Sequence, residues 1–328
     1  MKETLKKVTQ AFGVSGHEDE VRDVIIEEIK QYVDEIKTDA MGNLIAIKKG
    51  PKKKIMLAAH MDEIGIVATY IDDKGFIRFS NIGGVSPYFA LNQRVKFQNG
   101  VIGCVAAEGK LPDYKNLNLS KMFIDIGCKD KAETEKYVNI GDVATFVGDF
   151  YTMGDVAVSK AMDNRSGCAV LIEMIKGAPK TDNEIYYVFT TQEEVGLRGA
   201  KTAAYAIMPD CALAIDITTT ADTPECHKHD VIMTGGPALK IKDAVYIAHP
   251  EIRRLLEETA KAQNIPFTRE LLERGGTDCG AIQTTGIGVP CGGISIACRY
   301  IHSPCEMVSI TDLNNCVKLA TAFVKAYK

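Results

Sequence analysis

Short apolar runs alternate with amphipathic segments along most of the chain. The runs are bounded by polar or turn-forming residues, as buried strands usually are; four of them are IMLAA (55–59), YYVFTT (186–191), ALAI (212–215) and ISIA (294–297). Apolar residues spaced three and four apart predict helices from Ser15 to about Ile36, after Asp163, after Pro250 and near the end of the chain. Alternating strands and helices predict an α/β fold, with a central mixed sheet flanked by helices.

The pattern changes between residues 66 and 158. There the apolar residues form short alternating runs that are interrupted by glycines and by the hairpin-type pair Asn99-Gly100. Short alternating runs of this kind are typical of a compact β domain, whereas the α/β pattern lies on both sides of it in the chain. We therefore expect residues 1–65 and 159–328 to form one α/β domain and residues 66–158 to form a small β domain inserted into it.

Composition excludes several classes of protein. The chain has 328 residues and a formal net charge of −4, and its 39 basic residues form no blocks that would predict nucleic-acid binding. No apolar run reaches the length of about 18 residues that a membrane span requires, and the first ten residues lack a signal-peptide pattern. Ten scattered cysteines without CxxC pairs favour reduced thiols. We expect a cytoplasmic protein with no membrane or nucleic-acid partner.

Metal-type side chains follow the apolar runs. In open α/β sheets, ligands bind beyond the carboxyl ends of the strands. The residues at these ends, together with one acid before a predicted helix, are His60, Asp163, Glu193, Glu194, Asp216 and His302. Each alone would more often be a cap or a solvated loop residue. Together, two imidazoles and three carboxylates can hold two divalent cations if one carboxylate bridges them.

Two details of these motifs suggest a division of roles. Glu193 and Glu194 are consecutive, so their side chains point in different directions, and one can bind metal while the other moves protons. Asp62 lies two residues after His60 and can accept the other ring N–H of that imidazole, which would fix its tautomer. Two metals a few ångströms apart polarise a carbonyl and activate water, and amide hydrolysis is the natural use of such a site.

At this point the residues resemble the M42 family of metallo-aminopeptidases, whose members are also labelled glutamyl aminopeptidase, deblocking aminopeptidase or cellulase (endoglucanase). The segments that carry the resemblance span nearly the whole chain and are AAHMDEIG (58–65), KAMDNRSG (160–167), TTQEEVGLRGA (190–200), DIT (216–218), GGTD (275–278) and RYIHSPCE (299–306). The resemblance implies an enzyme that releases single residues from the amino end of short peptides. It also implies a PDZ-like inserted domain used in assembly into homo-oligomers, up to tetrahedral dodecamers built from dimers.

The resemblance further implies which residue does what. Two zinc or cobalt ions are expected, one held by His60 and Asp216 and the other by Glu194 and His302. Asp163 is expected to bridge them, Glu193 to act as the catalytic acid and base, and Asp278 to lie on the substrate side of the site. These seven roles are expectations from motif position.

Some alternatives stay open at the level of sequence. The same metals could serve an N-acyl amino acid deacylase or a carboxypeptidase, since fold and metals do not dictate which end of a substrate is recognised. A glycosidase is suggested only by family labels, and a non-catalytic assembly protein would have no need to keep every ligand. The segment Cys226–Asp230 is interpreted as a surface loop. Neither the preferred amino-terminal residue nor the physiological metal can be predicted.

Overall fold

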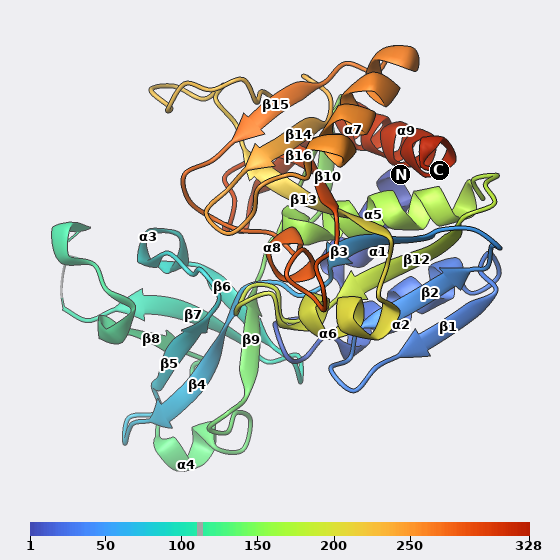
Figure 1. Ribbon diagram of the computed structural model, residues 1–328. Helices are drawn as coiled ribbons and strands as arrows, with labels where there is room; N and C mark the ends of the chain where they lie inside the picture. The colour runs from blue at the N-terminus through green and yellow to red at the C-terminus, as the bar shows by residue number, and fades with distance from the viewer. Residues whose placement is uncertain (110–113) are drawn as a thin grey trace.

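The protein has an α/β fold built around one large mixed sheet, with a separate β-barrel beside it (Figure 1). The structure is a computed structural model that describes residues 1–109 and 114–328. The large sheet has eleven strands and the barrel has six. The predicted mixed sheet with an inserted β domain is thus confirmed.

The order of strands in the large sheet brings the predicted site-bearing strands together. Along the main path the sheet contains β1 (Glu35–Thr38), β2 (Leu44–Lys48), β12 (Glu184–Thr190), β3 (Lys54–His60), β13 (Cys211–Thr219), β16 (Cys291–Arg299), β17 (Glu306–Ser309), β11 (Val156–Ser159) and β10 (Tyr151–Met153). Off this path, β14 (Ala238–Lys242) pairs with β16 and with β15 (Thr268–Leu271). The four neighbours β12, β3, β13 and β16 are mutually parallel, so their carboxyl ends lie at one edge.

Helices cover both faces of the sheet, because side chains alternate between the faces along each strand. Leu57 of β3 faces the larger core, whereas Met56 and Ala58 face the smaller one. The larger core is shared with α1 (Lys2–Gln10), α2 (Asp19–Ile29), α5 (Met162–Lys176), α7 (Pro250–Ala262) and α9 (Ile310–Ala326). The smaller core is shared with α6 (Arg198–Ile207) and α8 (Cys279–Ile282).

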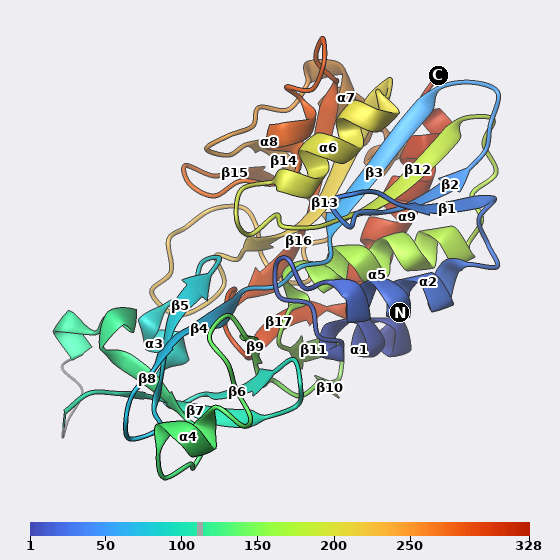
Figure 2. The same cartoon turned by 90° about the horizontal axis from the view of Figure 1, so that it is seen from below.

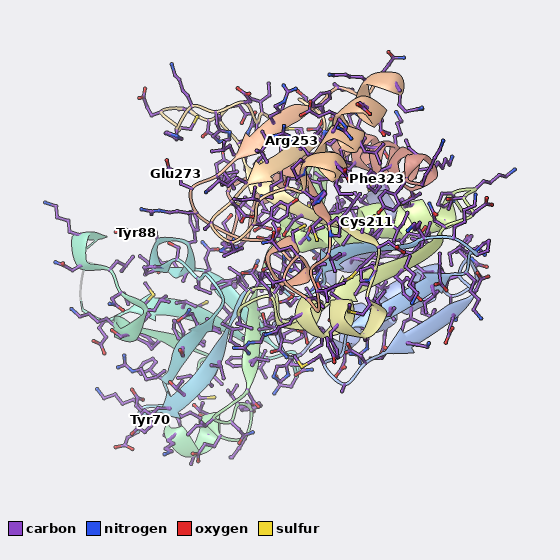
Figure 3. The ribbon with its side chains drawn as sticks, viewed as in Figure 1. Tyr70, Tyr88, Cys211, Arg253, Glu273 and Phe323 are labelled. Atoms are coloured by element: carbon purple, nitrogen blue, oxygen red, sulfur yellow. The ribbon has the colours of Figure 1, made fainter. Side chains whose placement is uncertain are left out.

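The barrel lies to one side of the sheet in both views (Figures 1 and 2). It closes in the order β4 (Gly65–Ile71), β5 (Ile77–Ile82), β8 (Met122–Asp125), β7 (Ile102–Ala107), β6 (Arg94–Phe97) and β9 (Val143–Phe146). Its short helices are α3 (Pro87–Ala90), α4 (Lys131–Thr134), η1 (Tyr114–Asn116) and η2 (Leu119–Lys121). It has its own apolar core. In Figure 3, Tyr70 and Tyr88 mark the barrel, far from Cys211 and Phe323 in the large domain.

Two details differ from the sequence pattern. The first long helix ends at Ile29, and Ile36, which was expected on it, lies in β1 and pairs with Ala46 of β2. Ile36 belongs to a hairpin of β1 and β2 because Asp39 accepts main-chain N–H groups of the turn that joins the two strands. Strands β10 and β11, within the predicted insertion, pair in the large sheet. None of the described helices is long and apolar enough to cross a membrane.

Candidate metal centre

The predicted ligands converge at the carboxyl edge of the parallel strands. His60 is the last residue of β3, Asp216 lies within β13, and Glu193 and Glu194 follow β12. His302 follows β16, and Asp163 lies at the start of α5. Because β12, β3, β13 and β16 are adjacent and parallel, residues separated by up to 242 positions in the chain meet at one place.

The described residues form two donor groups that share one carboxylate. His60, Asp163 and Asp216 form the first group, and Asp163, Glu194 and His302 form the second, with donor atoms within 4.8 Å of one another in each group. In the first, His60 Nε2 lies 3.0 Å from Asp163 Oδ1 and 3.6 Å from Asp216 Oδ1. In the second, His302 Nε2 lies 3.2 Å from Asp163 Oδ2 and 3.2 Å from Glu194 Oε1.

Asp163 is placed between the groups by an irregular start to α5. Its φ and ψ are −78° and 109°, which are not helical, and a cis peptide bond joins it to Asn164. Its main-chain N–H donates to Glu306 Oε2 at 3.0 Å, and the Asn164 side chain donates to the carbonyl of Ile215 in β13. Each oxygen of the Asp163 carboxylate faces a different histidine.

The donor set suits a pair of divalent cations. Each group offers one imidazole, one carboxylate of its own and the shared carboxylate, and three protein ligands with an open position are typical of catalytic zinc. Oxygen and imidazole donors also accept cobalt and manganese. The centre is largely buried, since the exposed fraction of the side chain is 2% for His60 and 11% for Asp163. Buried acids and imidazoles packed this closely are costly unless they are paired or bind metal.

The electrostatics of the cluster also favour cation binding. Burial lowers the pKa of His302, but hydrogen bonds to Asp163 and Glu194 outweigh burial and raise that pKa to about 12. Burial likewise opposes the charged form of Asp163, yet its hydrogen bonds with His302 and His60 hold its pKa below the usual value. Histidine binds metal as the neutral imidazole, so incoming cations would replace these ring protons.

Glu193 stands apart from the two donor groups. Its Oε2 lies 3.9 Å from His60 Nε2, and its side chain contributes to the wall of the cavity described below. Burial raises the pKa of Glu193 well above its usual value, and the charges of Asp216 and Asp278 add to the rise although His60 opposes it. A carboxyl group with a raised pKa beside a metal centre is suited to proton transfer.

Asp62 fixes the segment that carries the two glutamates. Its Oδ1 accepts the main-chain N–H of Glu193 at 3.0 Å, and its Oδ2 accepts that of Glu194 at 3.2 Å and the Ser15 hydroxyl at 2.6 Å. His60 Nδ1 lies 3.2 Å from the main-chain oxygen of Asp62 and 3.4 Å from its Oδ1. Asp62 thus contacts His60 as the motif predicts, and it also holds the neighbouring loop.

Replacing Asp62 with asparagine is expected to weaken cation binding about 10- to 100-fold, the range typical of groups that orient metal ligands. The amide keeps one acceptor oxygen and places an NH₂ group opposite a main-chain N–H. Competition with a chromogenic chelator measures the change. Asp72→Asn is the matched control, because Asp72 also accepts two main-chain N–H groups, from Lys74 and Phe76, in a barrel turn. Equal cation affinity in both variants and the parent would contradict the role of Asp62.

A cavity of about 1280 Å³ opens onto the donor groups. Its walls include both apolar and charged residues, among them Leu197, Ile217, Val245, Lys228, Asp230, Lys240, Arg269, Glu273 and Arg274. Glu273, labelled in Figure 3, lies on the loop after β15. The segment interpreted as a surface loop contributes His227 and His229 to this wall, and the described residues form no metal-type donor group that includes either.

Asp278 lies next to the donor groups but behind the cavity wall. It is 2% exposed, and Thr190 Oγ1 donates to its Oδ2 at 2.5 Å. Burial raises its pKa to about 7, and the charge of Asp216 contributes to the rise. Asp278 immediately precedes α8, which packs into the smaller core, and its side chain is buried there. Its place on the substrate side stays a prediction.

Glu306 is a functional candidate that the sequence reasoning missed. It begins β17 and is 2% exposed, and it accepts the main-chain N–H groups of Asp163 at 3.0 Å and His302 at 2.6 Å. Burial raises its pKa to about 8, with the charge of Asp163 adding to the rise. Its place in the segment RYIHSPCE, four residues after His302, was the available signal. Like Asp62, it fixes the main chain of two metal-type residues.

Comparison with known proteins decides the family. The profile of the family described as M42 glutamyl aminopeptidase matches residues 42–319. The chain belongs to this M42 family. It is therefore an M42 aminopeptidase, a hydrolase of peptide bonds with a candidate metal centre.

The relatives agree with this assignment along the whole chain. A protein of Acetivibrio thermocellus named "Putative aminopeptidase" is 62% identical over 97% of both chains. The structure of aminopeptidase APDkam598 from Desulfurococcus kamchatkensis superposes with a TM-score of 0.96 at 40% identity, covering 99% of this chain and 94% of that one. The TET1 peptidase of Pyrococcus horikoshii, described as assembling into a tetrahedron or a large octahedral shell, has a TM-score of 0.87 at 32% identity and 98% coverage of both chains.

Proposed function

We propose that this M42 aminopeptidase holds two divalent cations, zinc or cobalt, and releases amino-terminal residues from short peptides. His60 and Asp216 would hold one cation, Glu194 and His302 the other, and Asp163 would bridge them. The single observation that carries the proposal is the Asp163 carboxylate, which directs one oxygen to each donor group.

The residues of the chain then divide the chemistry among them. Two cations bound there would supply Lewis acidity that polarises a peptide carbonyl and acidifies a water molecule. Glu193 lies beside the donor groups without belonging to either, so it can accept a proton from the attacking water and deliver it to the leaving amine. Asp62 keeps Glu193 and Glu194 in place through their main-chain N–H groups. The cavity leaves room for a peptide to approach.

We extend the proposal to the division of the chain and to its assembly. The large sheet with its helices, including β10 and β11, would form the catalytic unit, and the barrel from β4 to β9 would act as the PDZ-like module for assembly and substrate access. The tetrahedron described for the Pyrococcus horikoshii relative supports assembly of this chain into a homo-oligomer, such as a tetrahedral dodecamer built from dimers. Ten free cysteines are compatible with the cytoplasm. Native mass spectrometry tests the assembly.

Removal of metal is expected to abolish hydrolysis of aminoacyl anilides, and zinc, cobalt or manganese supplied in turn should restore it. The reason is that all five proposed ligands meet at one centre and Glu193 alone cannot polarise the carbonyl. Metal analysis of the protein before and after chelation, with a panel of amino-acid anilides, gives both cofactor and preferred residue. Acylated anilides serve as the control and should not be cleaved. Undiminished cleavage by protein shown to be free of metal would refute the proposal.

A further inference from the structure

A loop of the inserted barrel touches two of the proposed metal ligands. Gly83 and Gly84 lie between β5 and α3 of the barrel. The main-chain oxygen of Gly84 lies 3.0 Å from Nδ1 of His302, 218 positions away in the chain. A Cβ atom at Gly84 would lie 2.6 Å from that Nδ1 and 2.8 Å from Cε1 of the same ring. Only glycine permits this approach without displacing the imidazole.

Gly83 makes a similar approach to the neighbouring ligand. A Cβ atom there would lie 3.1 Å from Cβ of Glu194 and 3.2 Å from its Oε2, and the φ of Gly83 is +73°. Glu194 and His302, the ligands that belong to the second donor group alone, are therefore both in contact with the barrel. The two ligands of the first group that are not shared, His60 and Asp216, both lie on strands of the large sheet.

The two histidines are oriented by different parts of the protein. His60 is 2% exposed, and its Nδ1 faces Asp62, two residues along its own chain segment. The His302 side chain is 30% exposed, so packing alone constrains it less. A ligating imidazole is fixed in tautomer and rotation by a partner that accepts its other N–H. For His302, a contact of that kind comes from the carbonyl of Gly84.

The barrel is also held next to the centre by a polar contact at its base. Thr145 of β9 donates to Glu63 Oε2 at 2.6 Å, and the same carboxylate pairs with Lys160 at 2.7 Å. All three residues are buried. Glu63 lies three residues after His60, and Lys160 lies three residues before Asp163. The position of the Gly83-Gly84 loop is thus tied to the chain segments that carry the first ligands.

We infer that the inserted barrel completes the second metal site, and that the Gly84 carbonyl is a positioning group that holds Nε2 of His302 toward the cation. The inference rests on the proposed function, because it takes His302 and Glu194 as ligands. It assigns the barrel a part in the chemistry in addition to any part in assembly. It also makes the two sites unequal, since only the second depends on the barrel.

The Gly84→Ala variant tests this assignment. We expect the parent to bind two cobalt ions per chain, and the variant to bind one of them unchanged and the other about 10- to 100-fold more weakly, the loss typical of a missing ligand partner. Titration of metal-free protein with cobalt, followed by the visible spectrum and by metal analysis, resolves the two affinities. Gly100→Ala controls for strain in the barrel away from the centre, because its φ of +92° strains any side chain although nothing lies within 4 Å of the added Cβ atom.

A double-mutant cycle separates positioning from general damage. His302→Ala should lose the same cobalt ion, and adding Gly84→Ala to it should change the remaining affinity little, because the carbonyl acts through a ring that is no longer there. Two ions bound by Gly84→Ala as tightly as by the parent would overturn the inference. So would an equal weakening of both sites. A parent that binds fewer than two ions would instead overturn the proposed function.

A measurement on the unmodified protein keeps the inference testable if the variant does not fold. In the cobalt-loaded parent, the Nδ1–H proton of His302 should give a paramagnetically shifted resonance that exchanges slowly with solvent, because its hydrogen bond to Gly84 shields it. The resonance is assigned by its absence from His302→Ala. Rapid exchange of that proton would show that Gly84 does not hold the ring.

Discussion

Replacing Glu193 with glutamine is expected to lower kcat about 10²- to 10⁴-fold, the range typical of a lost general acid or base, while two cations stay bound. Glutamine has nearly the volume of glutamate but cannot take up a proton. Glu193 lies 3.9 Å from His60 and outside both donor groups, so its loss removes no ligand. Its main-chain N–H remains hydrogen-bonded to Asp62. Steady-state rates and metal content, measured on the same preparation, check both halves of the prediction.

Two further variants sharpen this test. Glu194→Gln should lose metal as well as activity, because Glu194 Oε1 lies 3.2 Å from Nε2 of His302 within a donor group. Glu184→Gln, at the opposite end of β12, should match the parent in both measurements. If Glu193→Gln loses its cations, Glu193 is a ligand and the two glutamates have been assigned the wrong way round. If it retains the parent's kcat, another group carries the proton.

Most of the centre could be predicted from the sequence, because ligands in open α/β sheets bind beyond the carboxyl ends of the strands. His60 ends β3 and His302 follows β16, whereas Asp216 lies within β13, which continues to Thr219; β3, β13 and β16 turned out to be adjacent. A run of apolar residues shows where a strand is buried, and the residue after it must then lie at the sheet edge. The bridging geometry of Asp163 could not be predicted in this way, because it depends on the irregular main chain at the start of α5.

The supporting contacts carry little sequence signal. The Gly84 carbonyl is a main-chain group that every residue possesses, so no residue type marks it as a partner of His302. Glu306 and Asp278 are acids in loop or strand-end positions, where most acids are solvated. Their burial depends on how β17 and α8 pack, which is settled by tertiary contacts. Likewise, the alternation in 151–158 suits a strand in either sheet, and pairing with β17 decides between them.

The Asp163→Ala variant is expected to lose at least one of the two cations and about 10³-fold or more in kcat. Asp163 is the one residue common to both donor groups, so its removal leaves each with one imidazole and one carboxylate. Metal activation is worth several kcal/mol in such hydrolases, and each 1.4 kcal/mol corresponds to about a factor of ten in rate. Metal analysis after dialysis against trace zinc, together with anilide hydrolysis, gives both values.

Asp163→Asn makes the argument more specific. Its amide keeps the side-chain volume and one oxygen. A site that needs only one ligand atom from residue 163 should therefore survive in this variant. A pair of sites that share both oxygens of a carboxylate should not. We therefore expect Asp163→Asn to resemble Asp163→Ala in metal content. Asp149→Ala, at an exposed loop acid of the same type, controls for the loss of a negative charge. Two tightly bound ions in Asp163→Asn would show that the carboxylate does not bridge, and the dinuclear assignment would have to be replaced by two separate mononuclear sites.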